Sequence, residues 1–205
     1  MKYFFVYLLF LGCLSFNTQG QCFSDCKYKL VNAEDQRDSL GNLDPLKIIE
    51  QSEIILKGLI GCQIPEFSLT TIDGKLISSS DLKGKIVVLN FWFTSCAPCV
   101  FEMPALNKLV ENYSPDEVVF IAFSVDKSET IEKFLQKTSF NYQHISSGKD
   151  FLAEKFCIIF GYPTNMVFDK EGKLRQIFCG GSTDKKDKNA AFEKLKPVID
   201  EWLVK

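Results

Sequence analysis

Residues 86–104 read Ile-Val-Val-Leu-Asn-Phe-Trp-Phe-Thr-Ser-Cys-Ala-Pro-Cys-Val-Phe-Glu-Met-Pro, and this stretch decides the fold. Its first part, Ile86–Leu89, has the length and branching of a buried parallel strand. Beyond the first cysteine the apolar positions recur at helical spacing, at Cys99, Met103, Leu106, Val110 and Tyr113. Cys96 is therefore expected where a strand ends and a helix begins.

The expected place of Cys96 favours a reactive thiolate. A helix N-terminus offers unpaired N–H groups and a partial positive charge, and both stabilise thiolate over thiol. Such placement lowers a cysteine pKa from about 8.5 to roughly 3.5–7.5, and thiolate is the form that attacks disulfides. Cys99 lies one turn further on, within bonding reach and deeper in the helix. Pro98 suits the first turn, whereas Pro104 is expected to kink the helix.

A C-x-x-C pair by itself also fits half of a zinc site or a structural disulfide. A zinc site needs further ligands at suitable spacing, but there is no second such pair and His144 is the only histidine. We therefore expect no metal and no other cofactor. A hydrolase triad is opposed by the same lone histidine, whose polar neighbours suggest an exposed position on a strand.

The elements expected along the chain alternate between strands and helices and end in a hairpin. Such an order favours an α/β sheet of mixed direction. Strands are expected at 67–69 and 75–77 (a hairpin across Asp73-Gly74), 86–91, 118–125, 142–145 as a short edge strand, 164–168 and 173–178. Helices are expected at 44–59, from 97 to about 112, from a Ser128 cap to about 137, at 150–156, and over a last segment carrying Phe192, Leu195, Ile199 and Trp202. Pro197 is expected to bend or split that last helix.

Three motifs in order resemble the thioredoxin superfamily, and more closely its extracytoplasmic thiol–disulfide oxidoreductases of the TlpA/ResA type. The first is Phe91-Trp92 with Cys96-Ala97-Pro98-Cys99 and Glu102-Met103-Pro104. The second is Gly161-Tyr162-Pro163-Thr164, followed by Met166-Val167-Phe168 and Asp169-Lys170-Glu171-Gly172. The third is Phe67-Ser68-Leu69 with Asp73-Gly74-Lys75 and Asp81-Leu82-Lys83-Gly84-Lys85. The resemblance covers about residues 61–205.

The resemblance implies a thioredoxin-like α/β fold, with a mixed central sheet flanked by helices, an N-terminal hairpin and an extra N-terminal helix. It implies exchange of disulfides with protein substrates, in the direction of reduction, and an upstream electron donor. Two positions depart from the family pattern. Ser95 stands where many relatives have Trp, and Asn90 stands where thioredoxin has a buried Asp that helps to move protons.

The same resemblance and the helix-start argument together assign the candidate site residues. Cys96 is expected to attack and Cys99 to resolve, through a redox-active Cys96–Cys99 disulfide. Glu102, one turn beyond Cys99, is either a proton relay or a solvated helix residue. Pro163 is expected to be cis and to face the cysteines, as in the superfamily. The residues expected to contact substrate are Trp92, Tyr162 and Pro163.

Other functions fit the sequence less well. The formal net charge of −2, without a basic stripe interleaved with aromatics, opposes a nucleic-acid partner. A peroxiredoxin motif would place Pro and Thr where this chain has Leu89 and Phe93. A non-catalytic adaptor that holds a partner is opposed by the two intact cysteines. Reductant, oxidant and isomerase share the motif, so the direction of electron flow stays open at the level of the residues.

The N-terminus is typical of an exported protein. Lys2 precedes an apolar block too short to span a membrane, and Thr18-Gln19-Gly20 suits cleavage after Gly20. We expect a signal peptide at 1–20, an N-terminal extension at 21–60, a thioredoxin-like domain at 61–205 and a bacterial periplasmic location. A lipoprotein anchored to the membrane at Cys13 and an uncleaved anchor are the alternatives.

The cysteine count agrees with export, because disulfides persist outside the cytosol. Cleavage would leave seven of the eight cysteines. Beyond the C-x-x-C pair these are Cys22, Cys26, Cys62, Cys157 and Cys179, so at least one is unpaired or bonds another molecule. Cys22 and Cys26 are expected to pair with each other or with Cys62. Cys157 and Cys179 have apolar neighbours and are expected to be small buried hydrophobic residues.

Overall fold

The structure is a computed structural model and describes residues 23, 54–159 and 161–205. The expected signal peptide and most of the N-terminal extension, including the start of the helix expected at 44–59, lie outside these ranges. Residues 54–58 are helical and are followed by a turn. Ile55 and Leu59 from this segment are buried in the domain core, as is Phe23, whose ring lies edge-on to Phe156 with centroids 6.5 Å apart.

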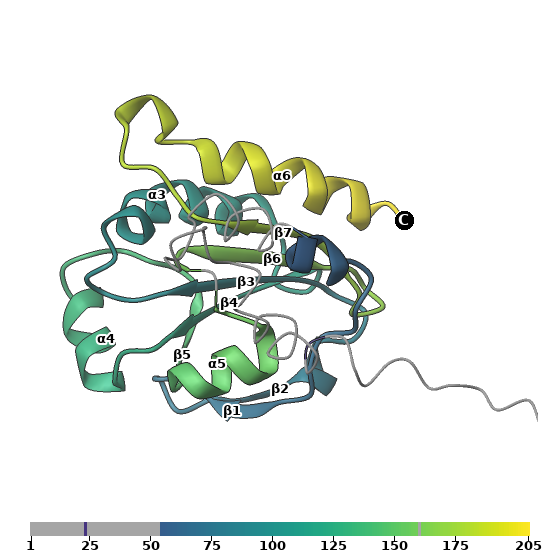
Figure 1. The fold of residues 1–205 in the computed structure, drawn as a ribbon, viewed down its shortest axis with the longest axis horizontal. Coiled ribbons are helices and arrows are strands. Elements are labelled where there is room, and N and C mark those ends of the chain that lie inside the picture. Colours follow the sequence, from purple (N-terminus) through teal and green to yellow (C-terminus); the bar gives the residue numbers. More distant parts are fainter. Residues whose placement is uncertain (1–22, 24–53, 160) are drawn as a thin grey trace, which may run out of the picture.

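A five-stranded mixed sheet in the order β5-β4-β3-β6-β7 forms the centre of the domain (Figure 1). Its strands are β3 (Ile86–Trp92), β4 (Val118–Ser124), β5 (Gln143–Ser146), β6 (Thr164–Phe168) and β7 (Leu174–Cys179). β3, β4 and β5 are parallel, whereas β6 is antiparallel to β3 and β7 is antiparallel to β6. A separate antiparallel hairpin joins β1 (Ser68–Thr70) and β2 (Leu76–Ser78). The mixed sheet and the opening hairpin are as predicted.

Helices cover both faces of this sheet (Figure 1). α3 (Ala97–Asn112), α4 (Ser128–Leu135) and α6 (Ala190–Leu203) contribute to the core on one face. α5 (Lys149–Phe156) and the β1–β2 hairpin contribute to the core on the other. Two short 3-10 helices, η3 (Ser79–Leu82) and η4 (Lys185–Asp187), lie in the connections.

Two details of the helices differ from expectation. Pro197 lies inside α6 without splitting it, and the helix runs unbroken to Leu203. Ser128 is the first residue of α4 and not its cap; Lys127 precedes the helix and makes no side-chain capping bond. From the sequence alone, a serine near a helix start fits either the N-cap position or the first helical position, because only the backbone angles distinguish the two.

The central strand β3 is buried along its whole length and supplies both cores. Because strand side chains alternate in direction, its odd-numbered residues Val87, Leu89 and Phe91 pack toward α5. The even-numbered ones, which include Val88 and Trp92, pack toward α3. Asn90 is even-numbered, so a polar side chain points into the apolar layer beneath α3. Its partners there define the site described below.

The chain that precedes the sheet bonds to both of its outer strands. Beside β7, Leu174 N donates to Cys62 O at 2.8 Å and Gly61 N donates to Leu174 O at 2.7 Å. Beside β5, Ile72 N donates to His144 O at 2.9 Å. His144 is consequently buried, and its Nε2 lies 2.9 Å from Phe140 O. The expectation of an exposed histidine was wrong, because the β1–β2 turn covers the strand edge on which it lies.

The cysteines outside the C-x-x-C pair agree with expectation in part: Cys157 is buried as predicted. Cys157 is also disulfide-bonded, as is Cys62. Cys179 is an exposed free thiol at the last residue of β7. Apolar neighbours in sequence did not predict its exposure, because alternate residues at a strand end face different environments.

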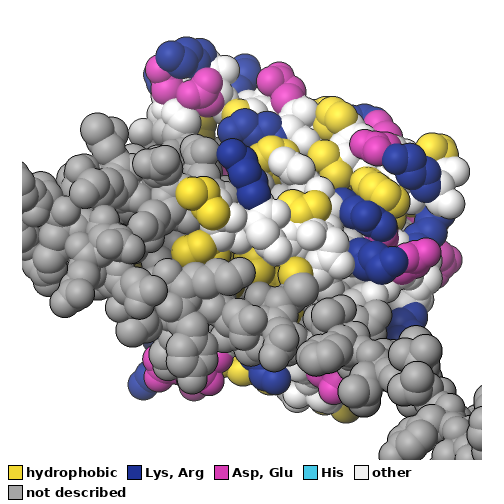
Figure 2. All heavy atoms as spheres, turned by 45° about the vertical axis from the view of Figure 1, so that its right-hand side comes forward, with side chains coloured by type: hydrophobic (Ala, Val, Ile, Leu, Met, Phe, Trp, Pro, Cys, Tyr) yellow, Lys and Arg dark blue, Asp and Glu magenta, His cyan; other side chains and the backbone are white. Residues whose placement is uncertain are grey.

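The surface carries charges of both signs. Figure 2 shows acidic and basic side chains mixed across one face of the domain, with hydrophobic side chains between them. Within the described ranges, none of the helices combines the length and the apolar character needed to cross a bilayer.

Candidate active site

The cysteine pair lies at the start of α3, directly after the loop that leaves β3. Cys96 is the N-cap residue of α3, and its Sγ accepts the Cys99 N–H at 3.3 Å. Cys96 and Cys99 form a disulfide with an S–S distance of 1.99 Å. The first turn of α3 contains no acidic residue. The helix N-terminus can therefore stabilise a thiolate on Cys96 without an acidic side chain in that first turn to oppose it.

The two cysteines differ in exposure, although less than predicted. The exposed fraction of the whole residue is 6% for Cys96 and 1% for Cys99. Cys96 is thus mostly buried in the oxidised protein, because the loop before it folds back and its own N–H donates to Phe93 O at 3.1 Å. Cys96 is still the more exposed of the two residues.

The loop before Cys96 is held by contacts from two other segments. Thr94 N donates to Asp126 Oδ2 at 2.6 Å, which ties it to the connection between β4 and α4. The Phe93 ring packs edge-on against Tyr162, with centroids 5.3 Å apart. These contacts hold the cysteine loop against the connection that leads into β6.

That connection carries the cis bond, between Tyr162 and Pro163, as predicted. Gly180 N donates to Pro163 O at 2.7 Å, which places the chain after β7 beside it. The next residue, Gly181, lies between two prolines. A Cβ added there would stand 3.0 Å from Pro163 Cγ and 3.2 Å from Pro98 Cβ. Segments that are far apart in sequence therefore converge at the cysteines with no room for a side chain between them.

A carboxyl group lies under the site, held by two amides. Asn90 and Asn165 are direct partners in the β3–β6 ladder, and both face α3. Asn90 Nδ2 donates to Glu102 Oε1 at 2.9 Å and to Asn165 Oδ1 at 2.9 Å, and Asn165 Nδ2 lies 3.2 Å from Glu102 Oε1. Glu102 is thus not simply a solvated helix residue. Register and helix direction together place its carboxyl group beneath the cysteine-bearing turn.

The environment of Glu102 shifts the pKa of its carboxyl group to near neutral pH. Burial raises the pKa of the Glu102 carboxyl group from 4.5 to about 7, because desolvation penalises the charged form. The amide donors of Asn165 and Asn90 and the positive charge of Lys194 lower the pKa, but they offset burial only in part. A carboxyl group with this pKa can take up and release a proton at neutral pH.

The three residues expected to contact substrate differ in how exposed they are. Trp92 has no exposed surface and packs between Phe134, Phe140 and His144. The contacts that the structure shows for Trp92 are packing contacts, and its contact with substrate stays a prediction. The side chain points into the α3 core because Trp92 has the same parity along β3 as Asn90. Tyr162 is partly exposed and Pro163 is buried beside the cysteine loop.

Sequence reasoning missed Asn165, Asp126 and Gly181. Asn165 had a usable signal, since it interrupts the apolar run Thr164–Phe168 as Asn90 interrupts the run in β3. A polar residue inside a buried strand needs a partner, so two such residues predict each other. Asp126 and Gly181 lie in connections, where no pattern in the sequence identifies their contacts.

A five-stranded mixed sheet, a C-x-x-C pair at the start of the helix after its central strand, and a cis proline beside that pair define a thioredoxin-fold thiol–disulfide oxidoreductase. Comparison with known proteins agrees with this class. The chain belongs to the AhpC/TSA family, which matches residues 60–177.

Individual relatives are named as thioredoxin-like proteins or as thiol-disulfide oxidoreductases. The chain is 36% identical to the thioredoxin-like protein YneN of Bacillus subtilis over 128 residues, which are 61% of this chain and 74% of that protein. It is 33% identical to the thiol-disulfide oxidoreductase ResA of Geobacillus kaustophilus over 139 residues, 67% and 79% of the two chains. The crystal structure of the thioredoxin domain of a thiol-disulfide oxidoreductase from Bacteroides vulgatus matches with a TM-score of 0.57 at 24% identity, over 68% of this chain and 97% of that one. This last likeness shows the fold.

Proposed function

We propose that this protein is exported and reduces disulfide bonds in other proteins, with Cys96 as the attacking thiolate and Cys99 as the resolving thiol. The observation that carries the assignment is the asymmetry of the pair. Cys96 Sγ caps the helix and accepts the Cys99 N–H at 3.3 Å, whereas Cys99 has only 1% of its surface exposed. A substrate disulfide approaches Cys96 more readily, and the helix N-terminus stabilises the negative charge that the attack requires.

The reaction proceeds by two exchanges. The Cys96 thiolate attacks one sulfur of the substrate disulfide, the substrate S–S bond breaks, and its other sulfur leaves as a thiolate. Cys99 then loses its proton, attacks Cys96 Sγ and forms the Cys96–Cys99 disulfide, which releases the second substrate sulfur. The substrate gains two electrons and the protein loses two. An upstream dithiol donor must return them before the next turnover.

Glu102 is proposed to take the proton from Cys99. The two residues are three apart on α3, so they share one face of the helix. Resolution needs a base that is ionised near neutral pH yet able to release the proton afterwards, and a pKa of about 7 meets both needs. Tyr162 and Pro163 are proposed to guide substrate through their backbone, since their connection lies beside the cysteine loop.

Reduction of insulin disulfides tests the activity, and alkylation tests the roles. Limiting iodoacetamide near neutral pH is expected to label Cys96 of the reduced protein before Cys99. The Cys99→Ser variant is expected to accumulate mixed disulfides, whereas Cys96→Ser is expected to be inert. Preferential labelling of Cys99 would reverse the two assignments.

Insulin reduction and consumption of hydrogen peroxide together separate the rival functions. A non-catalytic adaptor would leave insulin oxidised despite a folded structure. A peroxiredoxin would consume hydrogen peroxide, and the Leu89 and Phe93 positions that oppose this are both within the described domain. Equilibration with glutathione fixes the direction, because a reductant holds a potential well below that of the glutathione pool.

Export is supported by the apolar N-terminal block and by the disulfides at Cys62 and Cys157. The proposed product starts after Gly20 and acts in the periplasm. Mass spectrometry of the protein from fractionated cells tests this through the mass of the mature chain. A mass that retains residues 1–20 would indicate an uncleaved anchor. A lipid-modified Cys13 at the new N-terminus would indicate membrane attachment as a lipoprotein.

A further inference from the structure

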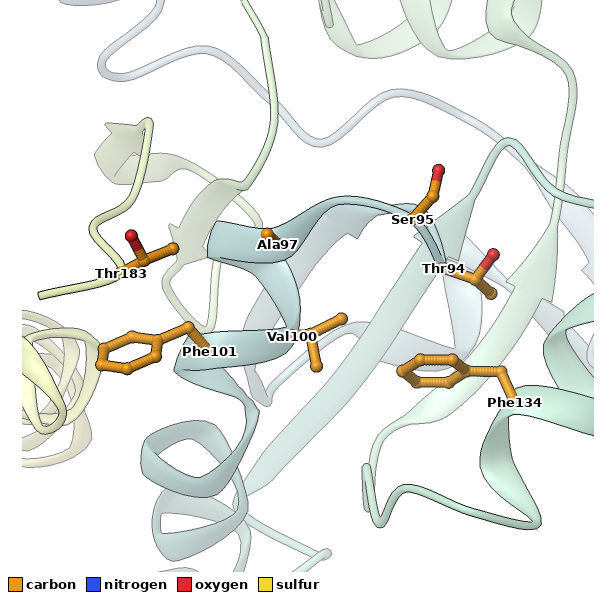
Figure 3. A pocket seen from close by; sticks show the side chains of 7 residues that line it. All are labelled: Thr94, Ser95, Ala97, Val100, Phe101, Phe134 and Thr183. Carbon is orange, nitrogen blue, oxygen red and sulfur yellow. The ribbon is translucent and has the colours of Figure 1, made fainter. Parts of the chain in front are cut away.

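A shallow hollow of about 530 Å³ lies at the start of α3 and is lined by the two chain neighbours of Cys96 (Figure 3). Ser95 and Ala97, the two chain neighbours of Cys96, lie at its rim. Val100 and Phe101, from the first turns of α3, also line it; in Figure 3 Val100 points toward the side of Phe134 and Phe101 toward the side of Thr183. The positions 97, 100 and 101 are three and four residues apart, so they form one strip on the outer face of the helix.

The hollow has a wall on each side of this strip. Phe134 from α4 forms one wall, and Thr183, which follows β7, forms the other (Figure 3). The Phe134 ring is supported from behind by Trp92, with centroids 5.3 Å apart. A ring held in this way keeps its position when the hollow is filled. The wall is thus fixed by the buried core and not by a flexible loop.

The lining is apolar and uncharged. It consists of alanine, valine and two phenylalanines with serine and threonine hydroxyl groups, and no Lys, Arg, Asp or Glu contributes to it. A charged side chain placed there would lose hydration without gaining a partner. An aromatic or branched aliphatic side chain would gain burial against four apolar residues.

The position of the hollow relative to Cys96 decides what reaches it. During exchange a substrate cysteine is bonded to Cys96 Sγ, and the Cα atoms of two bonded cysteines lie about 4.4–6.8 Å apart. Each further residue of an extended chain advances by at most about 3.6 Å. The hollow begins at the residues on either side of Cys96. A substrate side chain one or two positions from the attacked cysteine therefore reaches it.

We propose that this hollow is a specificity pocket, which binds an aromatic or branched aliphatic side chain located within two residues of the attacked cysteine in the substrate protein. Phe134 and Val100 are its main determinants. The inference rests on the proposed function, since it assumes that Cys96 forms the mixed disulfide. Ser95 belongs to the pocket because its small side chain leaves the rim open next to the cysteine.

A panel of disulfide-bonded peptides tests the pocket. Each peptide carries Phe, Leu, Ser, Asp or Lys at one or two positions from the reactive cysteine, and the second-order rate constant for oxidation of the full-length reduced protein by the peptide is measured. We expect the best Phe or Leu peptide to exceed its Asp counterpart by about 10-fold or more, since even one methylene in a hydrophobic pocket is worth about 10- to 200-fold. Bis(2-hydroxyethyl) disulfide, which has no such side chain, reports the exchange chemistry alone.

Variants assign the selectivity to the pocket. Phe134→Ala is expected to reduce the Phe-to-Asp ratio about 10-fold, and the nearly isosteric Val100→Thr to reduce it several-fold. Leu135→Ala, the next residue on α4, is the matched control for damage to the helix and is expected to keep the parent ratio. If Phe134→Ala does not fold, Val100→Thr and the peptide panel still decide the matter.

Failure of the proposed function and failure of the pocket proposal give different results in these experiments. Inertness of the folded parent toward every disulfide, including the small one, would overturn the proposed function. Turnover of the small disulfide with equal rates for Phe and Asp peptides would overturn the pocket alone. A Phe preference that survives both Phe134→Ala and Val100→Thr would also overturn it, because the selectivity would then come from elsewhere.

Discussion

Replacing Glu102 by Gln should change how the stability of the domain depends on pH. Glutamine has nearly the same shape and retains a carbonyl oxygen for the Asn90 and Asn165 amides, but it cannot ionise. In the parent protein burial raises the pKa of Glu102 from 4.5 to about 7. The folded state therefore binds this proton more tightly than the unfolded state does.

The sign and size of the effect follow from linkage. A raised folded-state pKa contributes stability that is fully present below about pH 4.5 and is lost as pH rises through about 7. The two values differ by about 2.5 pH units, and each unit corresponds to about 1.4 kcal/mol, so the contribution lost is about 3 kcal/mol. The variant lacks this dependence.

Urea denaturation of the oxidised proteins between pH 5 and pH 8.5 measures the difference. The free energy of unfolding of the parent should fall relative to that of Glu102→Gln, by most of the 3 kcal/mol, with the steepest change between pH 5 and pH 7. Groups common to both proteins cancel in the comparison. Parallel curves across this range would refute the reasoning, because they would mean that Glu102 has an ordinary pKa and is well hydrated.

Three further predictions concern other parts of the domain. Burial lowers the pKa of His144, so the folded state favours the neutral imidazole. The stability that this neutral form contributes is present above about pH 6.5 and should be lost as pH falls further. In the same urea series, His144→Gln should therefore lose less stability at low pH than the parent protein. Gly181→Ala should destabilise the domain by about 1–3 kcal/mol through overpacking against the two prolines and should slow insulin reduction, whereas Ser182→Ala should do neither. Maleimide added to the native oxidised protein should label Cys179 and leave Cys157 unlabelled, as peptide mapping would show; labelling of Cys157 would contradict its disulfide.

The sequence predicted the unit that carries the chemistry nearly to the residue. The change of apolar spacing at Cys96 marked both the end of β3 and the start of α3, because a buried strand and an amphipathic helix cannot share a period. The cis proline came from the resemblance alone, since no local pattern distinguishes Tyr162–Pro163 from a trans bond.

The parts of the site that were not predicted depend on contacts across the sheet. Asn90, Glu102 and Asn165 form one cluster only because the β3–β6 register sets the two amides opposite each other beneath α3. The predicted exposure of His144 was wrong for the same reason, because its polar neighbours in sequence do not indicate that the β1–β2 turn covers it. For Trp92 the sequence predicted contact with substrate but did not indicate the complete burial that packing against Phe134, Phe140 and His144 produces.

The bonding of both sheet edges by residues 61–72 has a consequence for the substrates of this protein. A strand at the edge of a sheet presents free N–H and C=O groups, and any extended chain can add to them as a further strand. A thiol–disulfide oxidoreductase that acts on proteins meets extended segments, which are rich in such groups. Here Gly61 and Cys62 occupy the backbone groups of Leu174 in β7, and Ile72 occupies the His144 carbonyl of β5. Fewer free positions at the sheet edges are therefore left for such a segment to add as a further strand.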